Sequence, residues 1–159
     1  MNPPRLFVVH YNQCDPKKCT SKKLQKFRLV TLLPKLRFLP RNAIILDPFA
    51  KKTLSIEDKN SIDRFGLAVI DCSWKHAEDI FKPFRTGRKL PRLLAANSVN
   101  YGRWEKLSSA EALAAALIII GHKEYAELLM SKFGWGPGFF NINPDLFEQV
   151  NETDAERGI

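Results

Sequence analysis

The chain has 159 residues and a mass of 18.2 kDa, the size of one compact domain. Its hydrophobic fraction of 45% supports a buried core and excludes disorder as the main state, and three cysteines are too few for a disulfide scaffold. The longest apolar run, 112–120, has nine residues, whereas a membrane-spanning helix needs roughly 20. Because no leader sequence opens the chain, we expect an intracellular, cytoplasmic protein with no membrane contact.

The net charge of +8 is concentrated in one part of the sequence. Residues 1–103 carry 21 Lys+Arg and 8 Asp+Glu, a net of +13, whereas residues 104–159 carry 4 and 9, a net of −5. This asymmetry favours a basic face that attracts RNA or DNA. An anionic membrane surface is the weaker interpretation, because no segment combines a basic stripe with a clean apolar face. An ordinary solvated surface is the alternative that net charge alone does not exclude.

The first two thirds of the chain alternate short apolar runs with polar segments. Strands are expected at 6–9, 43–46 and 67–70, with a short fourth strand at 93–94. Helices are expected at 15–27, 55–64 and 74–81. Two prolines, Pro34 and Pro40, interrupt the stretch between the first helix and the second strand.

The last third is expected to be mostly helical. Ser108 and Glu111 have the spacing of a capping box, which predicts a helix over 109–120 that ends at Gly121. Further helices are expected at 123–133 and from Asn143-Pro144 onward. The chain is therefore predicted to adopt an α/β fold with a mainly parallel sheet flanked by helices and a helical C-terminal part. We expect a basic α/β lobe at 1–93 and a helical lobe at 94–159.

Common catalytic and metal-binding motifs are absent from the sequence. It contains no GxGxxG, Walker A, HExxH or GxSxG motif. Cys14 and Cys19, with His10 nearby, make a metal site conceivable, and Cys72 and His76 are the remaining candidate ligands. Inert thiols around a helix start are the favoured interpretation, so we expect no metal.

Five segments of the chain resemble the signatures of one enzyme family. They are DPKKCTSKKL at 15–24, DCSW at 71–74, LPRLLAANSVNYG at 90–102, LSSAEALAAA at 107–116 and FGWG at 133–136. In this order they resemble the small-subunit ribosomal RNA aminocarboxypropyltransferases, over nearly the whole chain. The first segment is also similar to the N-terminal stretch of the ribosome-recycling ATPase once called RNase L inhibitor.

This resemblance implies a fold and a reaction in ribosome biogenesis. The implied fold is SPOUT-like, with a deep trefoil knot at the cofactor site that residues 94–159 complete. The implied cofactor is S-adenosylmethionine, whose 3-amino-3-carboxypropyl group is transferred to nitrogen 3 of a pseudouridine, usually 1-methylated, in small-subunit ribosomal RNA. Methylthioadenosine leaves, and the partner is this RNA or the pre-ribosomal small subunit. The resemblance also implies that the protein is a monomer.

The resemblance assigns the apolar part of the cofactor site. Trp74 and Ala77 would shelter the methyl group, and an indole face does attract a sulfonium cation. The alternative for Trp74 is an ordinary core aromatic on a helix. The adenine pocket carries over to Leu46, Pro48, Leu94, Leu107 and Ala112.

The polar part of the cofactor site rests on the same resemblance. The backbone carbonyl of Ile70 would meet the ribose hydroxyls. The hydroxyl and amide of Thr20 and the amide of Glu111 would bind the carboxylate of the transferred chain, which suits helix N-terminal amides. Glu105 would offer a backbone carbonyl to the adenine amino group.

Asp71 is the candidate catalytic residue. A carboxylate within hydrogen-bond reach can take the proton that must leave the acceptor nitrogen. A cap for the helix at 74–81 is an equally weighted alternative. The RNA face is expected to include Lys17, Lys18, Lys22, Lys23, Arg64 and Arg88, and Arg85, Lys89 and Arg103 would extend it. Two other functions stay open, a SPOUT-type RNA methyltransferase and a non-catalytic RNA-binding assembly factor.

Overall fold

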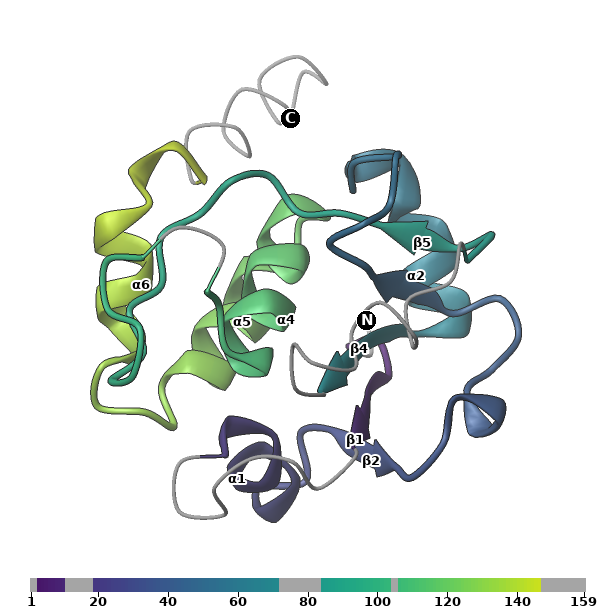
Figure 1. Cartoon of the computed structure of the whole chain (residues 1–159), viewed down its shortest axis with the longest axis horizontal. Coiled ribbons are helices and arrows are strands. Elements are labelled where there is room, and N and C mark those ends of the chain that lie inside the picture. Colours follow the sequence, from purple (N-terminus) through teal and green to yellow (C-terminus); the bar gives the residue numbers. More distant parts are fainter. Residues whose placement is uncertain (1–2, 11–18, 72–83, 104–105, 147–159) are drawn as a thin grey trace.

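The computed structural model describes residues 3–10, 19–71, 84–103 and 106–146 (Figure 1). Five strands are described: β1 (Leu6–His10), β2 (Thr31–Leu33), β3 (Ile44–Leu46), β4 (Leu67–Asp71) and β5 (Gly87–Arg88). The α-helices are α1 (Thr20–Lys26), α2 (Lys59–Phe65), α4 (Ser109–Ile119), α5 (Lys123–Met130) and α6 (Gly136–Ile142), with 3₁₀ turns η1 (Leu36–Phe38) and η2 (Ile56–Asp58). No helix in the described ranges is both long and apolar enough to cross a membrane.

The five strands form one sheet in which every pairing is parallel. Their order is β2-β1-β4-β3-β5. The apolar runs of β1 and β4 are buried because both faces of the sheet are covered. Leu6, Val8, Leu46 and Val69 belong to the main core, whereas Phe7, Val9, Ile45, Ala68 and Ile70 form a smaller cluster. The parallel sheet expected from the sequence is thus confirmed.

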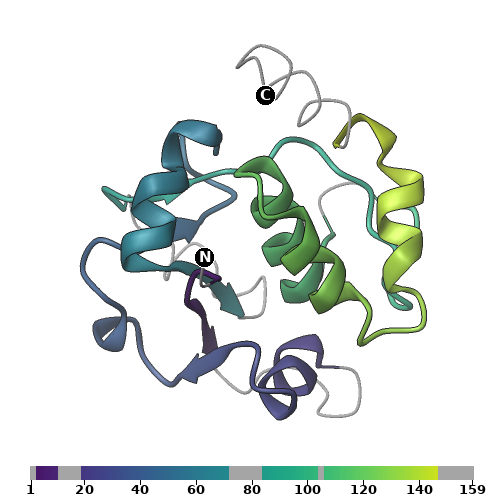
Figure 2. The ribbon, with the colours of Figure 1, turned by 180° about the vertical axis from the view of Figure 1, so that it is seen from behind.

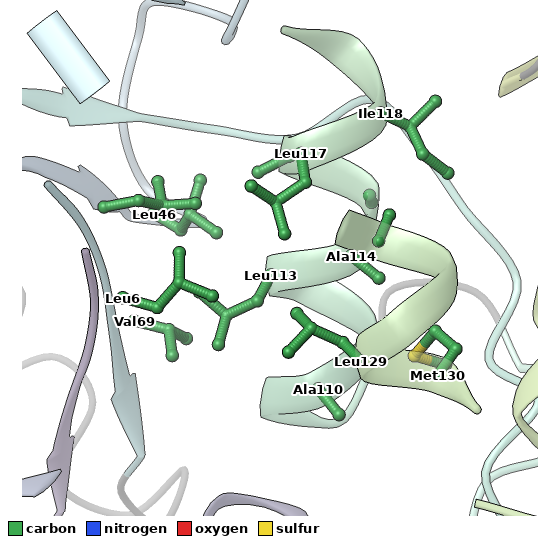
Figure 3. Close-up of a cluster of buried hydrophobic side chains, with 14 of the residues drawn as sticks. Leu6, Leu46, Val69, Ala110, Leu113, Ala114, Leu117, Ile118, Leu129 and Met130 are labelled. Atoms are coloured by element: carbon green, nitrogen blue, oxygen red, sulfur yellow. The ribbon is translucent and has the colours of Figure 1, made fainter. Parts of the chain in front are cut away.

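Helix α4 lies between the sheet and the remaining C-terminal helices (Figures 1 and 2). Leu113 and Leu117 point toward Leu6, Leu46 and Val69 of the sheet in Figure 3. The opposite side of the helix packs against Leu129 and Met130 of α5 (Figure 3). An apolar surface all around the helix is what this position requires.

The end signals that the sequence contains are present in the structure. Ser108 forms the capping box with Glu111, and Ser55 forms another with Asp58. Gly121 ends α4 with a φ of +92°, the left-handed conformation that glycine adopts without strain. The residues 144–146 are helical, as the Asn143-Pro144 signal predicts.

Two predicted boundaries are wrong. The first helix begins at Thr20 and not at residue 15, because Cys19 is extended, with a ψ of 111°. The last strand of the sheet is β5 and not 93–94, because the backbone of Gly87 pairs with Ile45, and a strand needs no apolar side chains for that. The helix expected at 74–81 lies outside the described residues.

Strand β2 and helix α6 were also not expected from the sequence. Strand β2 has three residues, too few for a periodic pattern. Helix α6 contains two glycines and a proline in seven residues, which is a poor helical composition. Packing overrides this composition, since Phe139 is fully buried and Gly136 lies against the end of α5.

Gly136 allows a close approach of backbone to backbone. A Cβ atom at this position would lie 1.8 Å from the carbonyl oxygen of Met130, whereas a Cβ at Gly138 would have no described atom within 4 Å. We expect Gly136→Ala to lower the free energy of unfolding by roughly 3 kcal/mol or more, because the backbone of α6 must move away. Gly138→Ala is the matched control and should change it by less than about 1 kcal/mol. Urea denaturation compares them, and equal midpoints would contradict the packing role.

Candidate functional site

The carboxyl ends of β1 and β4 lie side by side at the point where the chain leaves the sheet in opposite directions. After β1 the chain continues to β2 on one side, and after β4 it continues to β5 on the other. The last residues of the two strands, His10 and Asp71, are paired in register. Ligands of parallel sheets bind at such a switch point. The candidate site is therefore built around Asp71.

Three side chains surround one oxygen of the Asp71 carboxylate. The hydroxyl of Ser21 donates a hydrogen bond to Oδ2 at 2.8 Å, and the Cys19 thiol lies 4.0 Å from the same oxygen. The Nε2 atom of His10 is 3.8 Å from Oδ2 and 3.3 Å from the Cys19 sulfur. The His10, Cys19 and Ser21 side chains are buried, whereas 24% of the Asp71 side chain is exposed. The carboxylate is thus anchored on its inner side and remains accessible.

The same cluster contains atoms that metals favour. His10, Cys19 and Asp71 each present one such atom, all within 4.8 Å of one another. Their hydrogen-bond contacts account for this proximity, and a closed zinc site takes four ligands. The other sequence candidates, Cys14, Cys72 and His76, lie outside the described residues. We assign no metal ligands here.

Thr20 connects helix α1 to helix α4. Its Oγ1 atom accepts a hydrogen bond from the Ala110 amide at 3.3 Å. A hydroxyl that accepts one bond still has its own hydrogen to donate. Thr20 can therefore donate to an anion at the N-terminal end of α4, as the carboxylate assignment requires.

Glu111 holds the N-terminus of α4 to the segment 95–103. It is fully buried, and its carboxylate accepts hydrogen bonds from the amides of Ser108 at 2.9 Å and Ala96 at 2.6 Å. The Asn97 side chain donates a third bond at 2.6 Å. The backbone amide of Glu111 donates to Ser108 Oγ at 3.2 Å. The amide assigned to the cofactor carboxylate is thus already hydrogen bonded within the cap.

The residues assigned to the adenine pocket differ in their burial. Leu107 and Ala112 are half-buried and pack against the core that contains Leu46. Pro48 is exposed just beyond β3. Leu94 is half-buried, and both its amide and its carbonyl are hydrogen bonded by the side chain of Asn143, at 2.8 and 2.9 Å. Ile70 precedes Asp71 in β4, and Trp74, Ala77 and Glu105 lie outside the described residues.

Asp47 is a buried carboxyl group that sequence reasoning treated only as the end of a strand. It follows β3 directly and is 3% exposed. Burial raises the pKa of this carboxyl, although the hydrogen bond from the Phe49 amide opposes the shift. A buried Asp between Leu46 and Pro48 places a polar group beside the proposed adenine pocket. The Asp-Pro pair after an apolar run was the signal for it.

The candidate RNA-binding residues have different environments. Lys23 is exposed, with its Nζ 5.1 Å from the Phe133 ring, and Arg64 is exposed over Phe65 at 5.2 Å. Lys22 is half-buried, whereas Lys17 and Lys18 lie outside the described residues. The guanidinium of Arg88 instead donates to Asp58 at 3.1 Å, in a pair whose side chains are 14% and 7% exposed. This pair gives Arg88 a structural role as well.

Comparison with known proteins finds similarity over almost the whole chain. Residues 44–159 match the family model described as ribosome biogenesis protein, C-terminal, and residues 4–36 match a possible Fer4-like domain in RNase L inhibitor. The chain is 48% identical to a 16S rRNA aminocarboxypropyltransferase from Methanosphaera stadtmanae, over 94% of this chain and 89% of that protein. It is 46% identical to one from Methanocaldococcus jannaschii, over 94% and 88%.

A solved structure shares the fold. It is that of the SAM-dependent rRNA:acp-transferase Tsr3 from Vulcanisaeta distributa, with a TM-score of 0.86 and 40% sequence identity. The match covers 92% of this chain and 82% of that protein. At 40% identity the two proteins are similar in sequence as well as in fold.

Removal of the Glu111 carboxylate should destabilise the protein. Glu111→Ala leaves three hydrogen-bond donors without their acceptor, and we expect it to lower the free energy of unfolding by roughly 3 kcal/mol or more. The matched control, Glu127→Ala, changes an exposed glutamate of α5 and should have an effect within about 0.5 kcal/mol. Chemical denaturation measures both variants. A Glu111→Ala midpoint equal to that of the control would rule out this role.

Proposed function

We infer that this chain, which belongs to the family of 16S rRNA aminocarboxypropyltransferases, transfers the 3-amino-3-carboxypropyl group from S-adenosylmethionine to small-subunit ribosomal RNA. The similarity over more than nine tenths of the chain carries this conclusion. As the acceptor we propose nitrogen 3 of a pseudouridine, usually 1-methylated. The second product is then methylthioadenosine.

The described residues fit a nucleoside with an amino-acid chain. Leu46, Leu107 and Ala112 provide apolar contacts for an adenine, and the Ile70 carbonyl at the end of β4 is an acceptor for ribose hydroxyls. The Thr20 hydroxyl, which accepts from Ala110, donates to the carboxylate. When bound, S-adenosylmethionine supplies a sulfonium whose adjacent carbon is open to displacement. Orientation decides which carbon reacts, and Trp74 and Ala77 are proposed to shelter the methyl group.

Asp71 is proposed to act as the general base. Nitrogen 3 of the uracil ring carries a proton that must leave when the new carbon–nitrogen bond forms, and a carboxylate is the group that can accept it. Asp71 is the last residue of β4, and it is partly exposed at the switch point of the sheet, opposite the end of β1. The lysines of the first signature and Arg64 would bind the RNA phosphates around it.

Several finer features belong to the same proposal. We propose a SPOUT-like fold with a deep trefoil knot, completed by residues 94–159 after a basic lobe at 1–93. We also propose a cytoplasmic monomer without a metal that acts on the RNA or on the pre-ribosomal small subunit. The family resemblance supports these features, and the high TM-score to Tsr3 supports the fold.

The identity of the products tests the proposed reaction. Incubation of the protein with small-subunit RNA and carboxyl-labelled S-adenosylmethionine should place the label in the RNA and release methylthioadenosine, as measured by mass spectrometry. Release of adenosylhomocysteine with an unlabelled RNA would instead indicate a methyltransferase. Failure to bind the cofactor in calorimetry would favour a non-catalytic RNA-binding factor.

Substitution of Asp71 tests its role as the base. Asp71→Asn should slow transfer in a single turnover by roughly 100-fold or more, because an amide cannot accept the proton, while the Kd for S-adenosylmethionine stays within about twofold. Asp145→Asn, at an exposed position after α6, is the control and should leave the rate unchanged. An unchanged rate for Asp71→Asn would leave Asp71 only the role of a cap.

A further inference from the structure

Ser21 has a contact that the proposed cofactor and RNA sites do not explain. It lies in the first turn of α1 and is fully buried, and its hydroxyl donates to Asp71 Oδ2 at 2.8 Å. The two residues are 50 positions apart, so the bond connects α1 to the end of β4. A buried hydroxyl that donates to a carboxylate forms a charge-assisted bond, which is stronger than a neutral one.

The contacts of Asp71 differ between its two oxygens. Within the part of the chain that the structure describes, the side-chain contacts of this carboxylate are all made through Oδ2 and none through Oδ1. The titratable groups that face Oδ2 there are His10 from β1 and Cys19 at the start of α1. Oδ2 is therefore the oxygen that the described residues hold.

We propose that Ser21 is a positioning residue for the transfer reaction. Its hydrogen bond fixes Asp71 Oδ2 so that Oδ1 is presented to the N–H of the acceptor base in the RNA. This inference rests on the proposed function, in which Asp71 takes that proton. A carboxylate held by one oxygen loses rotational freedom before the substrate arrives, so less ordering remains for the reaction itself.

The position of Ser21 also links the two substrates. Its neighbour in α1, Thr20, is hydrogen bonded to Ala110 at the start of α4, where the carboxylate of S-adenosylmethionine is proposed to bind. The first turn of α1 thus contacts the proposed base through Ser21 and the proposed binding site for S-adenosylmethionine through Thr20. A displacement of this turn would change the angle between the attacking nitrogen and the reacting carbon.

The test compares Ser21→Ala with the parent chain in single-turnover transfer at neutral pH. We expect a rate about tenfold lower, whereas the Kd values for cofactor and RNA stay within about twofold. Ser21→Cys, which is similar in size but a weaker donor, should give intermediate values. Ser131→Ala removes an exposed serine hydroxyl that donates to the Leu128 carbonyl of α5, and it should match the parent chain.

A double-mutant cycle separates positioning from a merely structural role. If Ser21 acts through Asp71, Ser21→Ala should change the rate by less than about twofold in the Asp71→Asn background. An equal tenfold loss in both backgrounds, or a Ser21→Ala rate equal to that of the parent chain, would overturn the inference. If the parent chain itself released no methylthioadenosine, the proposed function would fail, and that result is distinct from any change between variants.

Discussion

The parallel pairing of β1 with β4 is the constraint on which the rest of the site depends. It places His10 and Asp71 opposite each other at the carboxyl ends of two neighbouring strands, although they are far apart in the sequence. The strand order sends the chain to β2 after β1 and to β5 after β4, on opposite sides of this pair, which makes it a switch point of the sheet. The start of helix α1 lies against this end of the sheet. Cys19, which precedes the helix, and Ser21 in its first turn therefore contact Asp71. The chemistry of the cluster thus follows from strand order.

A second constraint is the buried carboxylate of Glu111. A charge without exposure to solvent is expensive unless it is hydrogen bonded, and here three donors surround it. These donors come from the segment 95–103 and from the cap of α4. The side chain therefore fixes the position of an irregular segment that an apolar residue would leave free. Asn143 does the same for Leu94, through two backbone hydrogen bonds. These hydrogen bonds act together with the buried Ala95 and Ala96 to hold the segment in place.

The sequence predicted the parts of the fold that local patterns encode. The strands at 6–9, 43–46 and 67–70 and the capped helix at 109–120 have buried apolar runs or cap residues, and the structure has them within one or two positions. Strand β5 and helix α6 depend on pairing and packing partners elsewhere in the chain, so no local sequence pattern predicts them. For the same reason the site was predicted only in part. The resemblance assigned roles to Asp71 and Thr20. Ser21 lies in the same signature as Thr20 and Asp47 ends an apolar run, but the burial and contacts that make them notable are seen only in the structure.

The distribution of charge is consistent with where the cluster lies. Residues 19–46 contain seven Lys+Arg and no Asp or Glu, and this run begins at the turn that contacts Asp71. Not every cation in the basic part is available, since Arg88 is paired with Asp58 and therefore contributes little net field. The acidic excess of 104–159 resides in the part that contains the buried helix α4, where Glu111 serves structure. The basic run and the cluster around Asp71 thus lie in the first part of the chain, whereas Glu111, which holds the segment 95–103 to helix α4, lies in the acidic second part.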